Sequence, residues 1–325
     1  MQKTKLFPIY VAFSLIICIF AADMEQKRLD EVLLRNVAKL SKLSQREREM
    51  MPKGTAPLPS VEEVRQIVSL CKDIIFTDYF HKRQSDEQMR SHHIGVSMDE
   101  LYTLLRRQVA RGLQFCEECS ENDVLSAAEE IALKFIDQLP EVKRLLYTDV
   151  EAMFLSDPAA SNYGEVIYCY PVMNTMTHYR LAHLLHQMQV PVIPRIITEQ
   201  AHSKTGIDIH PGAQIGEYFA IDHGTGVVIG ETTIIGNHVT LYQGVTLGAK
   251  SFRYDENGDM LNIPRHPIIE DHVTVYSNAS ILGRITIGHH SVIGGNIWVT
   301  NDVPPYSRIQ QSKAVDTSFQ GGLGI

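Results

Sequence analysis

The stretch "GEYFAIDHGTGVVIGETTIIG", residues 216–236, belongs to a series of aliphatic residues spaced six apart. Ile209, Ile215 and Ile221 open the series, which resumes after an offset of two residues at Ile229 and Ile235. It continues along the chain at Leu241, Leu247, Ile269, Val275, Ile281, Ile287, Ile293 and Val299. A six-residue repeat is the signature of a parallel β-helix, in which three short strands complete one triangular turn and the aliphatic side chains stack inside. We therefore predict such a coil over residues 205–306.

A second set of small or apolar residues follows the first set at a distance of four residues. It comprises Ala213, Phe219, Thr225, Thr233, Val239, Val245, Val273, Ala279, Ile285, Ser291 and Ile297. Polar residues between these positions are expected at solvated corners, which for the histidines means His210, His238, His272, His289 and His290. The repeat is interrupted at 248–268, a polar stretch with the turn signal "ENGD", which predicts a loop protruding from the coil.

The chain before the coil has a helical pattern instead. Ser60 and Glu63 form a capping-box signature ahead of apolar residues on one helical face, which predicts a helix over 60–76. Ser97 and Glu100 repeat the signature for a helix over 97–109. Further helices are expected near 122–138, 141–155 and 169–189, separated by Pro140 and by residues 156–164. We predict an all-α domain over 24–204, and a flexible tail over 307–325 after the coil.

Composition limits the partners that this chain can have. With 325 residues and 44% hydrophobic content it can bury a core in each of two domains. A formal net charge of -8 argues against nucleic-acid binding, so small molecules or proteins are the expected partners. Its five cysteines are too sparse for a disulfide framework and favour a reducing compartment. The pair in "CEEC", 116–119, lacks the further ligands of a zinc site and is interpreted as two half-buried helix cysteines.

The N-terminus allows two interpretations. Lys3 and Lys5 precede a largely apolar run from Leu6 to Ala22, which is typical of a signal peptide or a marginal membrane anchor. Met24 opens an ordinary amphipathic sequence, so residues 1–23 are equally well explained as an upstream extension of a protein that starts there.

Several motifs together resemble the serine O-acetyltransferase family. They are "SDPA" and "HYRLAHLLH" in the helical part, then "GIDIHPGAQIG", "DHGTGVVIGET", "GVTLGA" and "RHPIIED" in the coil, in the family's order across residues 60–325. The resemblance implies that the coil is left-handed. It also implies transfer of the acetyl group of acetyl-CoA to the hydroxyl of L-serine, without a metal, as the first step of cysteine biosynthesis from serine.

The resemblance assigns roles that suit the chemistry of these side chains. An imidazole is suited to take the proton of an alcohol during acetyl transfer, and the family places His223 in that role. Asp208 is the carboxylate that orients the imidazole. Asp222 and His266 look like a second pair, which holds the amino group and hydroxyl of the substrate.

Two further residues complete the predicted serine site. The guanidinium of Arg265 can bind the serine carboxylate bidentately. Asp157, in "SDPA", would meet the amino group from the other side. Small residues that let a ligand approach the backbone predict the acetyl-CoA site, namely Gly248, Ser277, Gly283 and Gly295. After "VTLG" the family commonly has "GGTG", whereas this chain has "GAKSFRYDENG".

The family also implies partners. Its members form trimers that pair through their helical domains, so we expect a homotrimer or a dimer of trimers. The chain ends in "GLGI", and the resemblance implies that Ile325 inserts into O-acetylserine sulfhydrylase. Because acetyl-CoA is a cytoplasmic metabolite, the function favours a cytoplasmic enzyme with no obligatory membrane attachment.

Other functions remain open at this point. An O-acetyltransferase acting on a sugar or small alcohol shares the fold, and a noncatalytic scaffold could use the coil only to oligomerise. A β-helix carbonic anhydrase would use three histidines as metal ligands. Here each central histidine has an aspartate or arginine neighbour, which favours acid-base work and carboxylate binding.

Overall fold

The computed structural model describes residues 26–51, 57–80, 86–116 and 121–311. The chain forms two compact units, residues 1–52 and 53–325. In the first unit, residues 26–40 are helical and are followed by α2 (Gln45–Met50). Ser44 and Glu47 form a capping box at the N-terminus of α2. None of the helices in the described ranges is long and apolar enough to cross a membrane. The apolar segment within 1–23, "CEEC" between Cys116 and Cys119, and the tail beyond residue 311 lie outside the residues whose side chains are described.

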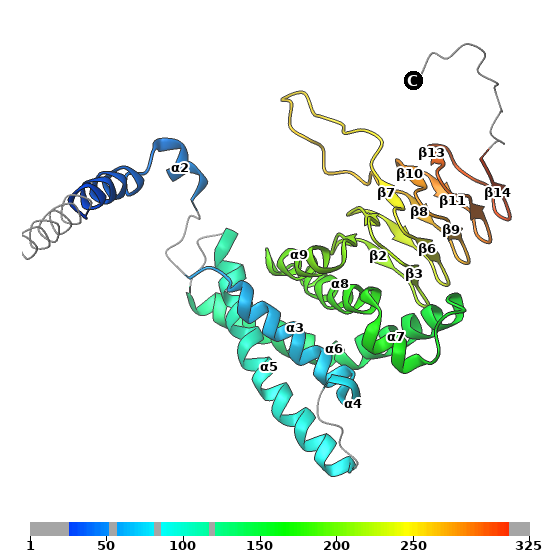
Figure 1. Cartoon of the computed structure of the whole chain (residues 1–325), viewed down its shortest axis with the longest axis horizontal. Coiled ribbons are helices and arrows are strands. Elements are labelled where there is room, and N and C mark those ends of the chain that lie inside the picture. Colours follow the sequence, from blue (N-terminus) through cyan, green and yellow to red (C-terminus); the bar gives the residue numbers. More distant parts are fainter. Residues whose placement is uncertain (1–25, 52–56, 81–85, 117–120, 312–325) are drawn as a thin grey trace, which may run out of the picture. The chain divides into compact units, whose positions relative to one another are not determined.

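The second unit begins with helices (Figure 1), which are α3 (Val61–Ile75), α4 (Thr77–Phe80), α5 (Glu87–Cys116), α6 (Glu121–Ser156), α7 (Tyr163–Cys169), α8 (Pro171–Gln187) and α9 (Ile193–Thr205). The helix predicted over 60–76 is confirmed as α3, with the Ser60 side chain accepting a hydrogen bond from the Glu63 amide at 3.3 Å. The helix expected near 169–189 is confirmed as α8, which begins at Pro171 and ends at Gln187, whereas the short helix α7 before it was not expected.

Two helix boundaries were predicted wrongly. Helix α5 begins at Glu87 instead of Ser97, and Ser97 lies buried within it, so its capping signature is not used. Helix α6 runs through Pro140, where we expected a break. Leu139 and Val142 on either side of Pro140 are both buried, so packing of the helix on the core outweighs the hydrogen bond that proline removes.

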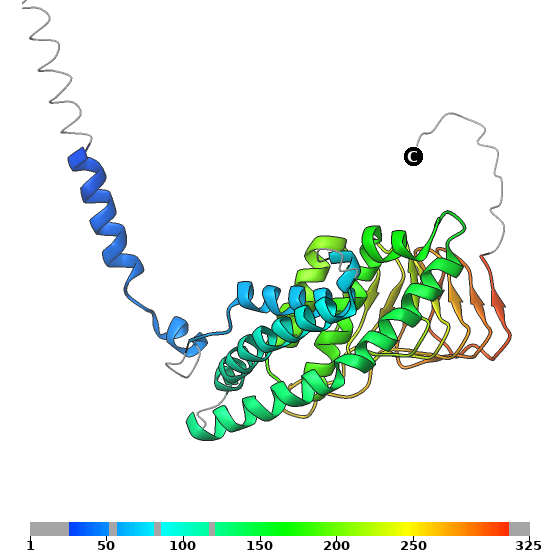
Figure 2. The ribbon, with the colours of Figure 1, turned by 90° about the horizontal axis from the view of Figure 1, so that it is seen from below.

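The rest of the unit is the predicted left-handed parallel β-helix, of about five turns. Its strands are β1 (Asp208–Ile209), β2 (Gln214–Ile215), β3 (Ala220–Asp222), β4 (Val228–Ile229), β5 (Ile234–Ile235), β6 (Thr240–Tyr242), β7 (Thr246–Gly248), β8 (Ile268–Ile269), β9 (Thr274–Val275), β10 (Ser280–Leu282), β11 (Thr286–Ile287), β12 (Val292–Ile293), β13 (Trp298–Val299) and β14 (Arg308–Ile309). They form three parallel sheets, ordered β1-β4-β7-β10-β13, β11-β8-β5-β2 and β14-β12-β9-β6-β3. The strands stack turn upon turn, with the helices beside the first turns and β14 at the far end (Figure 2).

Three edges separate the sheets, and each carries its own set of side chains. The turns that follow the β1 sheet form the loop edge, residues 210–213, 230–233, 249–267 and 283–285. The turns that follow the β2 sheet form the ring edge, residues 216–219, 236–239, 270–273, 288–291 and 304–307. The turns that follow the β3 sheet form the DHGTG edge, residues 223–227, 243–245, 276–279 and 294–297.

The aliphatic series is buried or packed against the core as predicted, and the second set of small or apolar residues has one exposed member among the described residues. Ile221 and Ile229 are buried as predicted, but Thr225 is exposed and Val227 takes the inward position. The DHGTG turn holds two extra residues, so the register resumes later than the repeat suggested. Gly224 there has a φ of +82°, and a Cβ on it would lie 2.5 Å from Ile207. The insertion therefore needs glycine, and it turns its other side chains outward.

A column of aromatic rings follows the ring edge. Tyr218, His238, His272, His290 and Tyr306 all have positive φ angles near 55–59°. Their successive ring centroids are 4.4, 4.7, 4.6 and 5.0 Å apart. The solvated-corner prediction is confirmed for the three histidines of this column, which are exposed.

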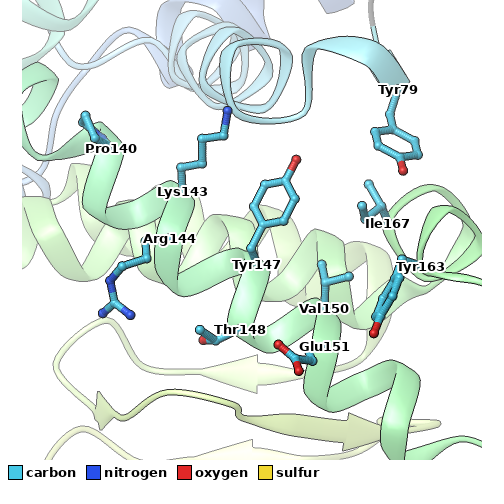
Figure 3. A pocket seen from close by; sticks show the side chains of 10 residues that line it. All are labelled: Tyr79, Pro140, Lys143, Arg144, Tyr147, Thr148, Val150, Glu151, Tyr163 and Ile167. Carbon is cyan, nitrogen blue, oxygen red and sulfur yellow. The ribbon is translucent and has the colours of Figure 1, made fainter.

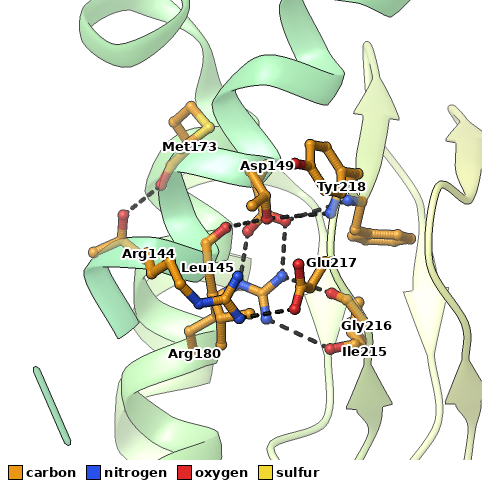
Figure 4. A network of polar contacts seen from close by, with 12 residues as sticks. Arg144, Leu145, Asp149, Met173, Arg180, Ile215, Gly216, Glu217 and Tyr218 are labelled. Atoms are coloured by element: carbon orange, nitrogen blue, oxygen red, sulfur yellow. Dashed lines mark hydrogen bonds and ion pairs between the residues drawn. The ribbon is translucent and has the colours of Figure 1, made fainter. Parts of the chain in front are cut away.

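A buried ion pair fixes the helices to the first turn of the coil (Figure 4). Arg180 of α8 donates to both carboxylate oxygens of Asp149 of α6, at 2.6 and 2.7 Å. The same guanidinium donates to the Gly216 carbonyl at 2.9 Å, and Asp149 accepts from the Phe219 amide at 3.3 Å. Because all of these groups are mutually bonded, the end of α6 is held in a fixed place relative to the coil.

Candidate active site

The DHGTG edge presents an imidazole beside a carboxylate. Asp222 is the last residue of β3, and His223 Nε2 lies 3.9 Å from its Oδ1. The His223 side chain is 72% exposed, while that of Asp222 is 18% exposed. His223 has a φ of 58°, at the start of the two-residue insertion. The exposed ring can therefore reach a ligand that approaches this edge from outside.

Helix α6 ends at the same edge and brings a second carboxylate. Asp157 accepts a hydrogen bond from the Tyr170 hydroxyl at 2.5 Å and another from the Ala159 amide at 2.8 Å. These two bonds lower the pKa of Asp157, and the charge of His223 acts in the same direction. The bond to Asp157 raises the pKa of Tyr170 to about 12. Asp157 is therefore a charged carboxylate close to His223 at neutral pH.

Tyr170 was not identified from the sequence. It stands alone before Pro171, with no motif or repeat around it, and only the fold brings it to Asp157.

Asp208 lies at the start of β1, and its amide donates to the Val227 carbonyl at 2.9 Å in the turn that contains His223. Among the hydrogen bonds and ion pairs of the described residues, none joins Asp208 to His223. Instead, the Asp208 carboxylate is grouped with Glu199 and His202, with the three ligand atoms within 4.8 Å of one another. The orienting role of Asp208 stays a prediction.

The loop edge positions His266 through Thr232 and Gly230. The Thr232 amide donates to His266 Nδ1 at 3.1 Å, which leaves the ring proton on Nε2. The imidazole packs against Gly230, where any Cβ would clash with the ring. His266 is only 7% exposed. Burial lowers its pKa to about 4, with the charge of Arg265 acting in the same direction, so this histidine is neutral at physiological pH.

Arg265 also contacts this edge. Its guanidinium donates to Glu231 Oε2 at 2.7 Å, and its amide donates to Thr232 Oγ1 at 2.9 Å. Arg284 donates to the Thr232 and His266 carbonyls at 2.7 and 3.0 Å. Glu231, Thr232 and Arg284 were not assigned from the sequence, although Glu231 and Thr232 end the motif "DHGTGVVIGET" that contains His223.

A basic pocket of about 310 Å³ lies between this edge and the protruding loop. Four cationic residues line it, namely Lys250, Arg253, Arg265 and Arg284. Gly283 lines it as well, which brings one predicted coenzyme residue together with Arg265. The concentration of positive charge is suited to carboxylate or phosphate groups.

The four predicted coenzyme residues fall on two edges. At the loop edge, the Gly283 amide donates to the Gly248 carbonyl at 2.9 Å. At the DHGTG edge, Gly295 packs on Ser277, so that an added Cβ would lie 3.0 Å from the Ser277 carbonyl oxygen. Each pair joins neighbouring turns of the coil, and its part in binding the coenzyme stays a prediction.

Two of the histidines predicted at solvated corners are partly buried instead. His210 is half-buried at the loop edge, accepts a hydrogen bond from the Gly212 amide at 3.0 Å, and meets the His186 ring edge-on. Burial is the main cause that lowers its pKa. His289, on the ring edge, is also partly buried.

The structure therefore builds two clusters on different edges of the coil. Asp157, Asp222 and His223 share the DHGTG edge, whereas Arg265 and His266 share the loop edge. No hydrogen bond or ion pair among the described residues connects the two clusters. The interpretation of Asp222 and His266 as a contacting pair is thus not seen within one chain.

A larger hollow of about 640 Å³ lies away from both edges, among α4, α6 and α7. Tyr79, Tyr147 and Tyr163 line it together with Lys143 and Glu151 (Figure 3). None of the predicted site residues reaches it, so its size alone does not make it the candidate site.

Comparison with known proteins gives consistent relatives, although no family model matches the sequence. The chain is 45% identical over 276 residues to a serine acetyltransferase of Synechococcus elongatus, covering 83% of this chain and 86% of the relative. It is 44% identical over 166 residues to the serine acetyltransferase of Bacillus subtilis, and the match covers 51% of this chain and 73% of the relative. It is also similar to the solved structure of serine acetyltransferase isoform 3 from Entamoeba histolytica in complex with cysteine, with 32% identity, a TM-score of 0.66, and coverage of 83% and 89%.

Proposed function

The chain belongs to the serine acetyltransferase family, and we propose that it transfers the acetyl group of acetyl-CoA to the hydroxyl of L-serine, giving O-acetyl-L-serine and CoA. The observation that carries the proposal is the likeness to a serine acetyltransferase over 83% of the chain. The exposed His223 beside Asp222 and Asp157 supplies the acid-base group that this reaction needs.

The chemistry assigned to His223 is proton transfer in both directions. Its imidazole takes the serine hydroxyl proton as the serine oxygen attacks the thioester carbonyl. A carbon-oxygen bond forms, the carbon-sulfur bond breaks, and the imidazolium returns the proton to the departing CoA sulfur. Asp208 would stabilise the imidazolium if a substrate-bound state draws the two side chains together, as the family pattern implies.

The charged groups on the two edges fit a zwitterionic amino acid. Asp157, held ionised by Tyr170, suits the serine ammonium together with Asp222. Arg265 suits the carboxylate. His266, neutral with its proton on Nε2, can donate a hydrogen bond to the substrate. A neutral sugar carries neither an ammonium group for Asp157 nor a carboxylate for Arg265, so these charged residues favour serine over the alternative of a sugar O-acetyltransferase.

Acetyl-CoA is the co-substrate of the proposed reaction. The basic pocket lined by Lys250, Arg253 and Arg284 offers cations for its phosphates. The small side chains at Gly283, Gly295 and Ser277 would let the pantetheine arm pass close to the coil.

The two clusters imply a site shared between subunits. We propose a homotrimer in which the loop edge of one coil faces the DHGTG edge of the next, with a dimer of trimers as the larger assembly. The protruding loop supports this arrangement, because Phe252, Tyr254 and Met260 expose 55%, 60% and 52% of their surface. Such apolar side chains are typical of surfaces that a partner covers.

Complementation tests the shared site directly. His223→Ala and His266→Ala subunits, each nearly inactive alone, are co-expressed and purified together. Random assembly should restore about a quarter of wild-type activity, because a site works when a His266→Ala subunit supplies His223 and its neighbour, a His223→Ala subunit, supplies His266. Mixed oligomers without recovered activity, or an active monomer, would contradict the arrangement.

The activity itself is tested by serine-dependent release of CoA from acetyl-CoA, measured with a thiol reagent. Replacing L-serine with sugars or other small alcohols should abolish release. Release without serine dependence would favour another acceptor, and no release with any alcohol would favour the noncatalytic scaffold.

Two proposals follow from the function. The tail that ends in Ile325 would bind O-acetylserine sulfhydrylase, with the isoleucine as an apolar anchor and the terminal carboxylate accepting backbone hydrogen bonds. The enzyme would work in the cytoplasm, where acetyl-CoA is made.

A further inference from the structure

The end of α9 gathers three side chains that no step of the proposed reaction uses together. Glu199 and His202 stand one turn apart in the last turns of α9, and so share one face. Gly206 caps the helix in the left-handed conformation, with a φ of 72°. The chain then reverses into β1, which brings Asp208 to the same place. One ligand atom from each of Glu199, His202 and Asp208 lies within 4.8 Å of the others.

The spacing of these atoms fits a metal ion. Ligands of tetrahedral zinc bind at about 2.0–2.2 Å, which places neighbouring ligand atoms roughly 3.4 Å apart. His202 Nδ1 and Glu199 Oε2 are already 3.5 Å apart. Their side chains are 43% and 47% exposed, so an ion can enter from solvent and water can complete the coordination.

The carboxylate of Glu199 is also oriented from outside the group. Its other oxygen, Oε1, accepts from Arg195 Nη2 at 2.5 Å. Such outer partners fix the direction of metal ligands. Although Arg195 offsets one of the two negative charges, the carbonyl end of α9 adds a negative field at this point. The position therefore favours a cation.

The ligand set selects among cations. An imidazole with two carboxylates suits zinc and similar transition ions, whereas magnesium and calcium prefer oxygen ligands alone. We propose that Glu199, His202 and Asp208 form a binding site for a divalent transition cation, with Zn²⁺ as its probe.

The site has a consequence for catalysis that rests on the proposed function. Asp208 is the carboxylate assigned to orient His223, and a carboxylate that ligates zinc is withdrawn from that role. Zinc binding and the pairing of Asp208 with His223 therefore compete. Micromolar zinc should lower the rate of serine acetylation by capturing Asp208, without entering the serine site itself.

Zinc affinity is measured on the full chain by competition with a chromophoric chelator, and the variants His202→Gln and Glu199→Gln are compared with the wild type. Both should bind zinc at least about tenfold more weakly, since loss of even an outer partner costs 10–100-fold. His289→Gln is the matched control. It disrupts another imidazole pair, in which His289 Nδ1 and His290 Nδ1 are 3.1 Å apart, and should leave this affinity unchanged.

The outcomes separate the site from the activity. If His202→Gln and Glu199→Gln, both folded by circular dichroism, bind zinc as tightly as the wild type, the site is refuted. The same holds if only His289→Gln weakens binding. Because this measurement needs no substrate, it stands even if serine acetylation is not observed. In the activity assay, zinc inhibition should shift to higher concentration in His202→Gln by the same factor as the affinity, and an unshifted inhibition would refute the competition for Asp208.

Discussion

Gly230→Ala tests how the loop edge positions His266. A Cβ at residue 230 would lie 2.7 Å from His266 Cγ, and closer still to Cδ2 and Nε2. Ordinary contacts of a Cβ begin at 3.4 Å, so the ring must move. It has little room, because His266 is 7% exposed and its Nδ1 is held by the Thr232 amide at 3.1 Å.

Gly230→Ala should lower both the stability of the fold and the rate of the reaction. Overpacking a well-packed site costs about 1–3 kcal/mol, and the strained Thr232 bond adds up to roughly 1 kcal/mol. We expect the free energy of unfolding to fall by about 2 kcal/mol. Displacing a substrate-contacting group by an ångström can lower kcat/KM on the order of 100-fold. The reduction should appear in kcat/KM for serine, since His266 is assigned to serine and not to the coenzyme.

The assay pairs urea unfolding with serine-dependent CoA release, for Gly230→Ala, His266→Ala and the double variant. In the His266→Ala background, Gly230→Ala should lower the free energy of unfolding by less than about 0.5 kcal/mol. The difference between this loss and the loss caused by Gly230→Ala in the wild type is the coupling energy between the two residues. Gly95→Ala is the control, because nothing lies within 4 Å of a Cβ there and helix propensity favours alanine. If Gly230→Ala keeps wild-type stability and kcat/KM, the positioning of His266 by Gly230 is wrong.

Four further outcomes are expected. His223→Ala should lower kcat by roughly two to four orders of magnitude with unchanged unfolding, because the side chain is 72% exposed; more than a third of the wild-type rate would sink its assignment as the base. Arg265→Lys should raise KM for serine more than KM for acetyl-CoA, and the opposite order would place Arg265 at the coenzyme. Arg180→Met should lower the free energy of unfolding by about 3–5 kcal/mol, measured in urea, because it leaves Asp149 buried without its partner; a loss under 1 kcal/mol would contradict this. Deleting Ile325 should weaken sulfhydrylase binding at least about tenfold while acetylation survives, since burying an isoleucine is worth roughly 1.5–3 kcal/mol. Unchanged binding would mean that the tail does not bind the sulfhydrylase through Ile325.

The coil could be predicted from the sequence because its period is imposed by packing. Each strand is two or three residues long, and its inward side chain fills a slot repeated in every turn, so a misplaced residue is visible in the pattern. Thr225 was misplaced because the period cannot show where inside a turn an insertion lies. The helices were less predictable. Pro140 and Ser97 carry strong local signals, but the burial of α5 and α6 outweighs them.

The candidate site was predictable only where a family motif contains it. His223, Arg265 and His266 stand within such motifs, and the structure places each at an edge. Tyr170 and Arg284 stand in none, and they reach Asp157 and the His266 carbonyl through the fold alone. The sequence could not predict that the two clusters lie apart, because motifs that are neighbours in sequence can lie on different edges of a triangular coil.

The departures from the six-residue period explain where the chemistry lies. A regular turn fills its interior with aliphatic side chains and bonds its backbone to the turns on either side, so it offers little freedom to place catalytic side chains. Two insertions break this regularity. The extra residues in the DHGTG turn expose His223, and the long turn at 249–267 carries Arg265 and His266. They lie on different edges, so in the proposed arrangement a single coil presents two half-sites. If both halves act on one serine, a second coil must supply the missing half, and activity should depend on assembly.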